Sequence, residues 1–313
     1  MSELTIRRYS LEDQRTWDAF VKKACNGHFL FMRGYMDYHA DRFPDCSFIV
    51  MHHEKWIAVI AGTISTEGVW SSHAGLTFGG FIFDNTVGTL DILSSFSLLE
   101  AELRLLGAKM LRYKPLPWIY THCPAEASLY ALFRCGAQLV SRQISSAFVP
   151  GTQKMEERRR RRSKLAEKMG VQITESIDFK SFWNLLNTCL NERHDVAPVH
   201  SSSELELLAG RFPNNIRLFI AKIENRLVAG TLLYITDRVV HTQYLATSAE
   251  GREIGALDAL ISHLLTSSLT QQRYFDFGVS CEDNGRILNE GLLTQKEGFG
   301  GRAVVHDVYE YLL

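Results

Sequence analysis

The chain has 313 residues, of which 46% are hydrophobic, and its 34 Lys and Arg stand against 35 Asp and Glu. This composition excludes disordered and collagen-like proteins, the length predicts about two domains, and the net charge near zero argues against nucleic-acid binding as the main activity. No apolar run approaches the roughly 18–20 residues that span a bilayer. The start MSELTIRRYSLEDQ is too polar for a signal peptide, so we expect a cytoplasmic protein without membrane insertion.

The six cysteines give no sign of a metal site. They are spread along the chain as Cys25, Cys46, Cys123, Cys135, Cys189 and Cys281. No two of them form a C-x-x-C pair, and none stands near a histidine at zinc-finger spacing. We therefore predict reduced, partly buried thiols and no bound metal.

The first half of the chain alternates strand-like and helical segments. After a strand at 4–8, Ser10 begins a helix, and a second short helix is expected at 35–42. The segments CSFIVMHH, KWIAVIAGTI and GVWSSHAGLTFGGFIF predict strands, the first two joined by a polar turn. A long helix at 89–106, the strand KMLRYKP, the helix EASLYALFRCG and the strand QLVSRQISSAFV complete this half at Gly151.

The second half repeats this order of elements. It predicts the strand VQITES, a helix capped by Asp178, a shorter helix LELLAGRF and a meander of three strands that ends in RVVHTQYLATS. The helix EIGALDALISHLL, the strand YFDFG, the helix ILNEGLLTQKEGFG and the strand AVVHDVYEYLL follow. Local text also repeats, since SFIVMHHEKWIAVIAGTI matches LFIAKIENRLVAGTLLYI. We predict an α/β fold with mixed sheets, duplicated as domains 1–151 and 152–313.

A basic segment, KMEERRRRRSKLAEKMG, opens the second half and has the composition of a helix. Its five consecutive arginines, Arg158–Arg162, would point to all sides of that helix. Such a block is either a solvated helix face or a phosphate-binding element, because the planar guanidinium binds phosphate oxygens in pairs.

The order of elements resembles the GNAT acyltransferase fold, and its tandem arrangement resembles the Fem-type double-GNAT transferases. YFDFGVSCEDNGRILNEGLLTQKEGFGG is similar to a strand-loop-helix segment of that group, with Lys296 and Phe299 at matching positions. GLTFGG, YKPLPWIY and HDVAPVHSSSEL resemble a branch that acylates amino sugars during bacterial surface-polysaccharide (O-antigen) assembly. The resemblance implies an N-acyltransferase with acyl-CoA as co-substrate and a dTDP- or UDP-linked amino sugar as acceptor, reacting directly in a ternary complex.

GNAT enzymes bind the pyrophosphate of acyl-CoA with an Arg/Gln-x-x-Gly-x-Gly/Ala loop at a helix start, through backbone N–H groups and the positive helix end. Arg252 and Gly255 match this loop, but Leu257 replaces its last small residue. The resemblance implies an oxyanion-binding N–H between Leu245 and Thr247. The remaining predicted cofactor contacts are Asn289 and Lys296.

Transfer to an amine requires a neutral amine, an aligned attack worth roughly 7–11 kcal/mol, and oxyanion donors worth roughly 3–4 kcal/mol. The Tyr that many GNAT enzymes use as acid is replaced by Thr294. A general base is useful but not obligatory, and we predict His200 or Asp276 in this role. The alternatives are a surface His200 and an Asp276 that caps the following turn.

Further polar and aromatic residues are candidates for substrate binding. Gln243 and Tyr244 are neighbours on one strand, so only one of them is expected to face the substrate. Tyr120 follows two prolines and would stack on a base or sugar, or belong to the core. The full predicted set is His39, Arg42, His73, Lys114, Tyr120, Arg158, Arg159, His194, Gln243 and Tyr244.

Two other functions remain open from the sequence. A Fem-like aminoacyl-tRNA-dependent transferase acting on a peptidoglycan precursor would explain Arg158–Arg162 as a tRNA contact, although no coiled-coil insertion is visible and nucleic acid is otherwise not expected as a partner. A degenerate, non-catalytic GNAT pair would explain Leu257 and Thr294.

Overall fold

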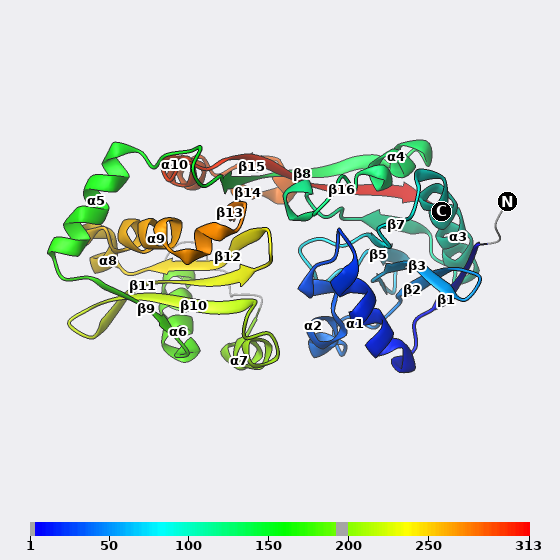
Figure 1. Cartoon of the computed structure of the whole chain (residues 1–313), viewed down its shortest axis with the longest axis horizontal. Helices are drawn as coiled ribbons and strands as arrows, with labels where there is room; N and C mark the ends of the chain where they lie inside the picture. Colours follow the sequence, from blue (N-terminus) through cyan, green and yellow to red (C-terminus); the bar gives the residue numbers. More distant parts are fainter. Residues whose placement is uncertain (1–3, 192–199) are drawn as a thin grey trace. The chain divides into compact units, whose positions relative to one another are not determined.

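The computed structural model describes residues 4–191 and 200–313 (Figure 1). Its contacts divide the chain into two compact units. Unit 1 comprises Met1–Ile144, Cys281–Ile287 and Val305–Leu313, and unit 2 comprises Ser145–Ser280 and Leu288–Val304. These units differ from the predicted domains 1–151 and 152–313, because the end of the last strand pairs with a strand of the first half.

That last strand, β16 (Arg302–Leu312), pairs antiparallel with β7 (Met110–Tyr113), from Tyr309 opposite Tyr113 to Leu312 opposite Met110. The boundary between the units therefore falls inside β16. It also falls inside β8 (Gln138–Phe148).

Unit 1 contains two groups of strands. Its further strands are β1 (Leu4–Arg8), β2 (Phe48–His52), β3 (Lys55–Ile60), β4 (Thr63–Ile64), β5 (Val69–Ser71) and β6 (Phe81–Phe83). Its helices are α1 (Gln14–Lys23), α2 (Arg33–Met36), α3 (Thr89–Leu105) and α4 (Ala127–Arg134). An antiparallel sheet joins β1, β2, β3 and β6, whereas β5 lies parallel to β7 in a second sheet. The segment 68–83, predicted as strand throughout, is thus divided between two sheets.

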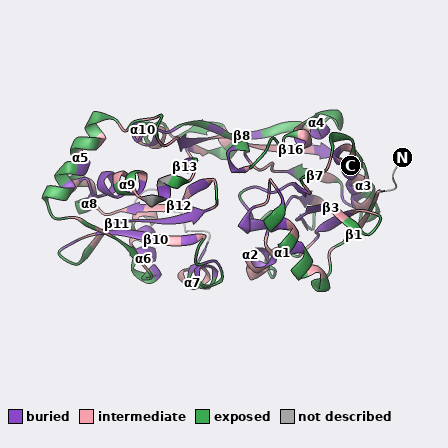
Figure 2. Cartoon of the chain, viewed as in Figure 1, coloured by how far each residue is buried: buried purple, intermediate pink, exposed green. Residues whose placement is uncertain are grey.

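Helix α3 shows how the sequence builds the core of unit 1. Its residues Ile92, Phe96, Leu99 and Leu103 recur at helical spacing and are all buried in one cluster with strand residues such as Trp70. Burying each such side chain contributes roughly 1.5–3 kcal/mol. The strands of both units are largely buried, whereas the outer faces of the helices are exposed (Figure 2).

Unit 2 is a sheet with helices on both faces (Figure 1). Its strands are β9 (Gln172–Ser176), β10 (Ile216–Ile223), β11 (Arg226–Ile235), β12 (Val239–Thr247) and β13 (Tyr274–Val279). The short strand β14 (Cys281–Glu282) that follows belongs to unit 1, and β15 (Ile287–Leu288) lies at the boundary between the units. The helices of unit 2 are α5 (Glu157–Lys168), α6 (Phe179–Asn191), α7 (Ser202–Arg211), α8 (Ala249–Ile254), α9 (Ala256–Thr266) and α10 (Glu290–Gly298). The strand order is β9-β10-β11-β12-β13-β8, with β12 and β13 parallel and the other pairs antiparallel.

The two faces of this sheet have different cores. Alternate residues of β10, among them Phe219 and Ala221, join Leu260 of α9 in one hydrophobic cluster. On the other face, α6 approaches so closely that a Cβ atom on Gly230 would lie 2.7 Å from the ring of Phe182. Only glycine permits this contact, and it fixes α6 across β11.

The cysteine prediction is wrong for one pair. Cys25 and Cys123 form a disulfide with Cα atoms 5.8 Å apart, which joins the chain after α1 to the loop before α4. The other four cysteines are free thiols. Within 4–191 and 200–313, no helix combines the length and the apolar character that crossing a membrane requires.

Candidate functional site

The sheet of unit 2 opens between two parallel strands. Pairing of β12 with β13 covers Val239–His241 and Tyr274–Asp276, with His241 opposite Asp276 as the last pair. Beyond this pair β12 runs on to Thr247, while β13 bends at Gly278, whose φ is +74°. The described part of the chain therefore leaves one edge of β12 without a neighbouring strand.

Two backbone amides point into this opening. The N–H of Ser248 donates to the carbonyl of Val228 on β11. Because hydrogen-bonded and non-hydrogen-bonded pairs alternate along antiparallel strands, the N–H groups of Leu245 and Thr247 face away from β11. These are the residues predicted to bound an oxyanion site, and their orientation suits that role.

A buried carboxylate lies where the two strands part. Asp276 is fully buried and accepts hydrogen bonds from the Ser145 hydroxyl and from the Gly278 N–H at 3.0 Å, and its other carboxylate oxygen lies 2.9 Å from His241 Nδ1. It also forms the predicted turn cap through Gly278. The prediction of Asp276 as a base in direct contact with a substrate is therefore wrong, because no part of its side chain is exposed. His241, with 15% of its side chain exposed, is the accessible member.

His241 was missed by the sequence analysis. It lies within a strand, and no local motif marks it. Its partner stands 35 residues further along the chain, so only the parallel pairing of β12 with β13 brings the two together.

A β-bulge at Gln243 determines which side chains share a face with His241. The pairing with β11 passes from Thr242 to Tyr244, so Gln243 is the extra residue. The bulge turns Tyr244 toward α6 and α7, where it packs edge-on against Trp183 with ring centres 5.6 Å apart. Asp276 points to this same face. Its neighbours Phe275 and Phe277 belong to the hydrophobic cluster on the α9 face, and side chains alternate between the two faces of a strand.

Tyr244 also contacts one of the predicted bases. Its hydroxyl lies 2.7 Å from Nδ1 of His200, which is 8% exposed. Burial raises the pKa of Tyr244 to about 12, so the hydroxyl stays protonated at neutral pH. His200 is thus a buried, oriented group rather than a surface histidine, and its catalytic role stays a prediction. The predicted His194 lies outside the described residues.

The predicted pyrophosphate loop is covered by a helix. A Cβ atom on Gly255 would lie 2.7 Å from the carbonyl oxygen of Arg162 on α5. The Arg162 guanidinium donates to the carbonyl of Arg252 and, at 3.1 Å, to Asp258 of α9. Arg252 itself donates to the carbonyl of Thr247 at 3.0 Å. In this arrangement the start of α9 faces α5, and Gly255 serves their close packing.

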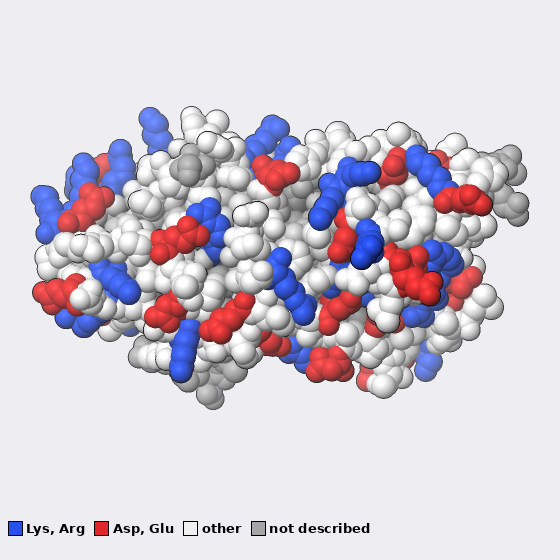
Figure 3. Space-filling model, turned by 60° about the horizontal axis from the view of Figure 1, so that its bottom comes forward, with Lys and Arg blue, Asp and Glu red and all other residues white. Residues whose placement is uncertain are grey.

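The arginines of α5, the helix predicted for the basic segment, divide between two faces. Arg159 turns inward, pairs with Asp258 at 3.0 Å and stacks over the ring of Phe299. A phosphate contact by Arg159 is therefore wrong, since residues 159 and 162 share the helix face that packs on α9. Arg158, Arg160 and Arg161 are exposed, and blue side chains gather over α5 at the left of Figure 3.

Two predicted cofactor contacts have structural roles in α10. Lys296 is 7% exposed, and its ammonium donates to the carbonyls of Gly278 at 2.9 Å and Val279 at 2.6 Å. It thereby fixes the bend of β13 rather than presenting a charge to a ligand. Asn289 caps the same helix by accepting the N–H of Leu292.

Most predicted substrate residues of unit 1 are buried. His39 and His73 lie with ring centres 5.4 Å apart and are 1% and 3% exposed. Burial lowers the pKa of His73 to about 3, so it is neutral at neutral pH. Tyr120 packs against Phe78 with ring centres 5.0 Å apart. The prediction that His39, His73 and Tyr120 are open to a substrate is wrong, because each of them is buried in an aromatic core.

The other two candidates of unit 1 are partly or fully exposed. Lys114 donates to the carbonyls of Ala74 and Leu76, and its pKa is lowered to about 8, chiefly by burial and also by Arg112. Arg42 is exposed beside the ring of Tyr38 and stays a predicted substrate contact.

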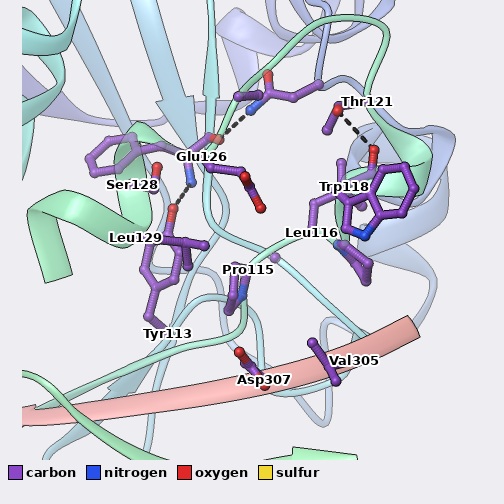
Figure 4. Close-up of a pocket in the computed structure, with 15 residues that line it drawn as sticks. Tyr113, Pro115, Leu116, Trp118, Thr121, Glu126, Ser128, Leu129, Val305 and Asp307 are labelled. Carbon is purple, nitrogen blue, oxygen red and sulfur yellow. Dashed lines mark hydrogen bonds between the residues drawn. The ribbon is translucent and has the colours of Figure 1, made fainter. Parts of the chain in front are cut away.

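Unit 1 has a pocket that the sequence analysis did not predict. It lies between the start of β6 and the end of β7, with a volume of about 610 Å³ that includes its open mouth. Figure 4 shows the carboxyl group of Glu126 and the indole of Trp118 on either side of this space, with Val305 and Asp307 below it. Tyr113 and Pro115 line the pocket. Lys114 between them does not, because side chains alternate along an extended segment, and its ammonium donates to the carbonyl of Ala74 instead.

Among the described residues, no group of three or more His, Cys, Asp or Glu side chains is arranged to hold a metal ion.

Comparison with known proteins finds one family whose domain is similar to the part of the chain that holds this site. Residues 153–284 match the family described as Acetyltransferase (GNAT) domain. This match covers β9 to β13 and hence the opening of β12. A search of curated proteins found no match to the sequence.

Solved structures extend the similarity to the whole chain. The structure of FemX is similar with a TM-score of 0.71 and 14% identity, over 98% of this chain and 97% of that one. A tandem GNAT protein from the clavulanic acid biosynthesis pathway has a TM-score of 0.56 and 12% identity, over 99% and 98% of the two chains. L-PGS from Bacillus licheniformis has a TM-score of 0.57 and 12% identity, over 81% and 80%.

At these identities the structures establish a shared fold. The chain has a mixed α/β fold with tandem GNAT-like architecture, which confirms the predicted fold class. Its residues 153–284 match the Acetyltransferase (GNAT) domain family, and its structure is similar to that of FemX. The resemblance to nucleotide-sugar acyltransferases stays a prediction.

Proposed function

We propose that the chain is an N-acyltransferase and that unit 2 binds the activated acyl group along the open edge of β12. The observation that carries this proposal is the separation of β12 from β13, which leaves the N–H groups of Leu245 and Thr247 facing the opening. A preorganised N–H directed at the developing oxyanion is worth roughly 3–4 kcal/mol of barrier reduction.

The acceptor amine approaches from the face covered by α6 and α7. Tyr244 and His200 lie on this face, and a protonated Tyr244 hydroxyl offers a hydrogen bond to the acceptor or holds His200 in place. The bulge at Gln243 supports this assignment, because bulges beside active sites re-aim side chains. Gln243 and Tyr244 therefore stay among the proposed acceptor contacts.

For the acyl donor we favour an aminoacyl-tRNA, with a peptidoglycan precursor as acceptor, as in the Fem-like alternative. Two observations support this choice over acyl-CoA. The chain is similar to FemX over nearly its whole length, and α5 covers Gly255 at the start of α9, where a CoA pyrophosphate would bind. The exposed Arg158, Arg160 and Arg161 suit contacts with a nucleic-acid backbone.

Acyl transfer from acyl-CoA to a dTDP- or UDP-linked amino sugar is the second candidate. It is supported by the Acetyltransferase (GNAT) description of the family that matches 153–284 and by the sequence segments that resemble sugar acyltransferases. It requires α5 to move away from Gly255, or the pyrophosphate to bind elsewhere along unit 2.

One set of reactions separates these functions. The purified chain is incubated with acyl-CoA and dTDP- or UDP-linked amino sugars, and free thiol is followed. In parallel it is incubated with charged tRNA and a UDP-linked peptidoglycan precursor, and acylated product is detected by mass spectrometry. Product that disappears after RNase treatment supports the aminoacyl-tRNA donor, whereas thiol release supports acyl-CoA.

A double variant tests the basic helix in the same reactions. Exchanging Arg158 and Arg161 for Gln should weaken the tRNA reaction and its salt dependence. The control is the same exchange at two arginines of the β-sheet, the half-buried Arg217 and the exposed Arg226. Absence of product in every reaction would reject an acyltransferase and favour a non-catalytic GNAT pair.

A further inference from the structure

His241 and Asp276 form a pair that no sequence pattern marks, at the point where β12 and β13 separate. We propose that His241 is the proton acceptor of the acyl transfer and that Asp276 and Ser145 orient it. This role rests on the proposed N-acyltransferase function and adds a catalytic residue to it.

The hydrogen bonds around Asp276 determine the tautomer of His241. The carboxylate accepts from the Ser145 hydroxyl and from the Gly278 N–H. These two donors favour an ionised, accepting carboxylate whose second oxygen, 2.9 Å from His241 Nδ1, needs a donor there. Nδ1 of His241 then carries the hydrogen, and Nε2 is left as an acceptor, which is the form that a general base requires.

The surroundings of His241 leave its ring edge accessible. Gly278 adopts a left-handed conformation beside the ring, and a Cβ atom there would lie 3.3 Å from His241 Cε1. Lys296 holds this bend in β13 through the carbonyls of Gly278 and Val279. A side chain at position 278 would therefore press on the imidazole, whereas glycine leaves its edge open.

The spacing along β12 determines how far His241 lies from the proposed acyl-binding amide of Leu245. Leu245 follows four residues later, and the bulged Gln243 takes up part of that length, so about 10 Å of strand separates their Cα atoms. The proposal places the acceptor amine in this interval, between the imidazole of His241 and the N–H of Leu245. Other titratable or charged groups near this face are Tyr244, His200, Glu204, Cys189 and Lys296.

The amine nitrogen forms a bond to the acyl carbonyl carbon, and the bond from that carbon to the sulfur or oxygen of the donor breaks with its electron pair. The proton lost by the nitrogen passes to Nε2 of His241 and then to the departing thiolate or alkoxide. Asp276 stays ionised throughout and stabilises the imidazolium that forms.

The experiment compares His241→Gln, Asp276→Asn and His200→Asn with the wild type in pH profiles of kcat/KM. His241→Gln should lower kcat/KM by about 10²–10⁴-fold and remove the acid limb that the base contributes. Asp276→Asn should cause a similar loss, because an Asn amide donates to Nδ1 and reverses the tautomer. His200→Asn should retain the acid limb. Far-UV circular dichroism verifies that each variant folds, and added imidazole should partly restore His241→Gly.

A second measurement does not depend on turnover. In wild-type protein labelled with ¹⁵N-histidine, His241, assigned by the loss of its signal in His241→Gln, should carry its hydrogen on Nδ1. A hydrogen on Nε2 would overturn the proposal. Wild-type activity that persists within tenfold in His241→Gln would reject this role alone, whereas a wild type without transfer in any donor–acceptor pair would reject the proposed function as well.

Discussion

The attachment of α5 to α9 can be tested with Asp258→Ala. Asp258 has only 4% of its side chain exposed and pairs with Arg159, which is 14% exposed, and with Arg162, which is 36% exposed. A charge-assisted hydrogen bond is worth about 1.5–3 kcal/mol. The bond to Arg159 counts in full, and the one to Arg162 is reduced by solvent screening. We expect Asp258→Ala to cost about 3 kcal/mol.

Hydrogen exchange measures this loss where it occurs. If α5 opens as a local unit, about 3 kcal/mol corresponds to roughly 100-fold faster exchange of its amides. Glu157→Ala is the matched control, because Glu157 pairs with Arg160 and Arg161 on the surface and is 55% exposed. That variant should change exchange by less than about threefold. Equal effects of the two substitutions would refute the attachment and remove one argument against a CoA pyrophosphate at Gly255.

Three further outcomes are expected. The pKa of His73 is lowered to about 3 in the folded chain, so its neutral form contributes fully to the free energy of unfolding above pH 6.5, and this contribution is lost as the pH falls. Urea titrations should show the free energy of unfolding fall by about 2 kcal/mol between pH 6.5 and 5, and this pH dependence should be absent in His73→Asn. Alkylation of the denatured, unreduced chain should label four of the six cysteines, and labelling of all six would contradict the Cys25–Cys123 disulfide. Gly278→Ala should destabilise the chain by about 1–2 kcal/mol through its positive φ, and an unchanged melting temperature would show that the bend relaxes.

Features that depend on local periodicity were predictable. The apolar spacing of Ile92, Phe96 and Leu99 predicted α3, and the charged, unbranched residues around Arg160 predicted α5. The order of elements was sufficient to identify a GNAT-like fold. The two helix signals are local periodicities, and the order of elements is the sum of such local signals, so neither depends on a contact between distant segments.

The site itself depends on contacts between distant segments. Arg159 meets Asp258 across 99 residues, so the sequence did not reveal which arginines of α5 turn inward. The bulge at Gln243 moves the Tyr244 side chain to the opposite face of the sheet, and no Gly or Pro in the sequence indicates this bulge. Asp276 and His241 both have side chains suited to proton transfer, but only His241 is partly exposed, whereas Asp276 is fully buried. Those properties follow from the packed sheet rather than from residue type.

The pairing of β16 with β7 also bears on synthesis of the protein. The first 144 residues of unit 1 are translated well before β16, the strand that completes the edge of β7. Until β16 is added, β7 presents unpaired N–H and C=O groups, and exposed edges of this kind recruit other strands. The nascent chain should therefore depend on chaperones until β16 has left the exit tunnel, and removing Val305–Leu313 should produce aggregation rather than a smaller folded protein.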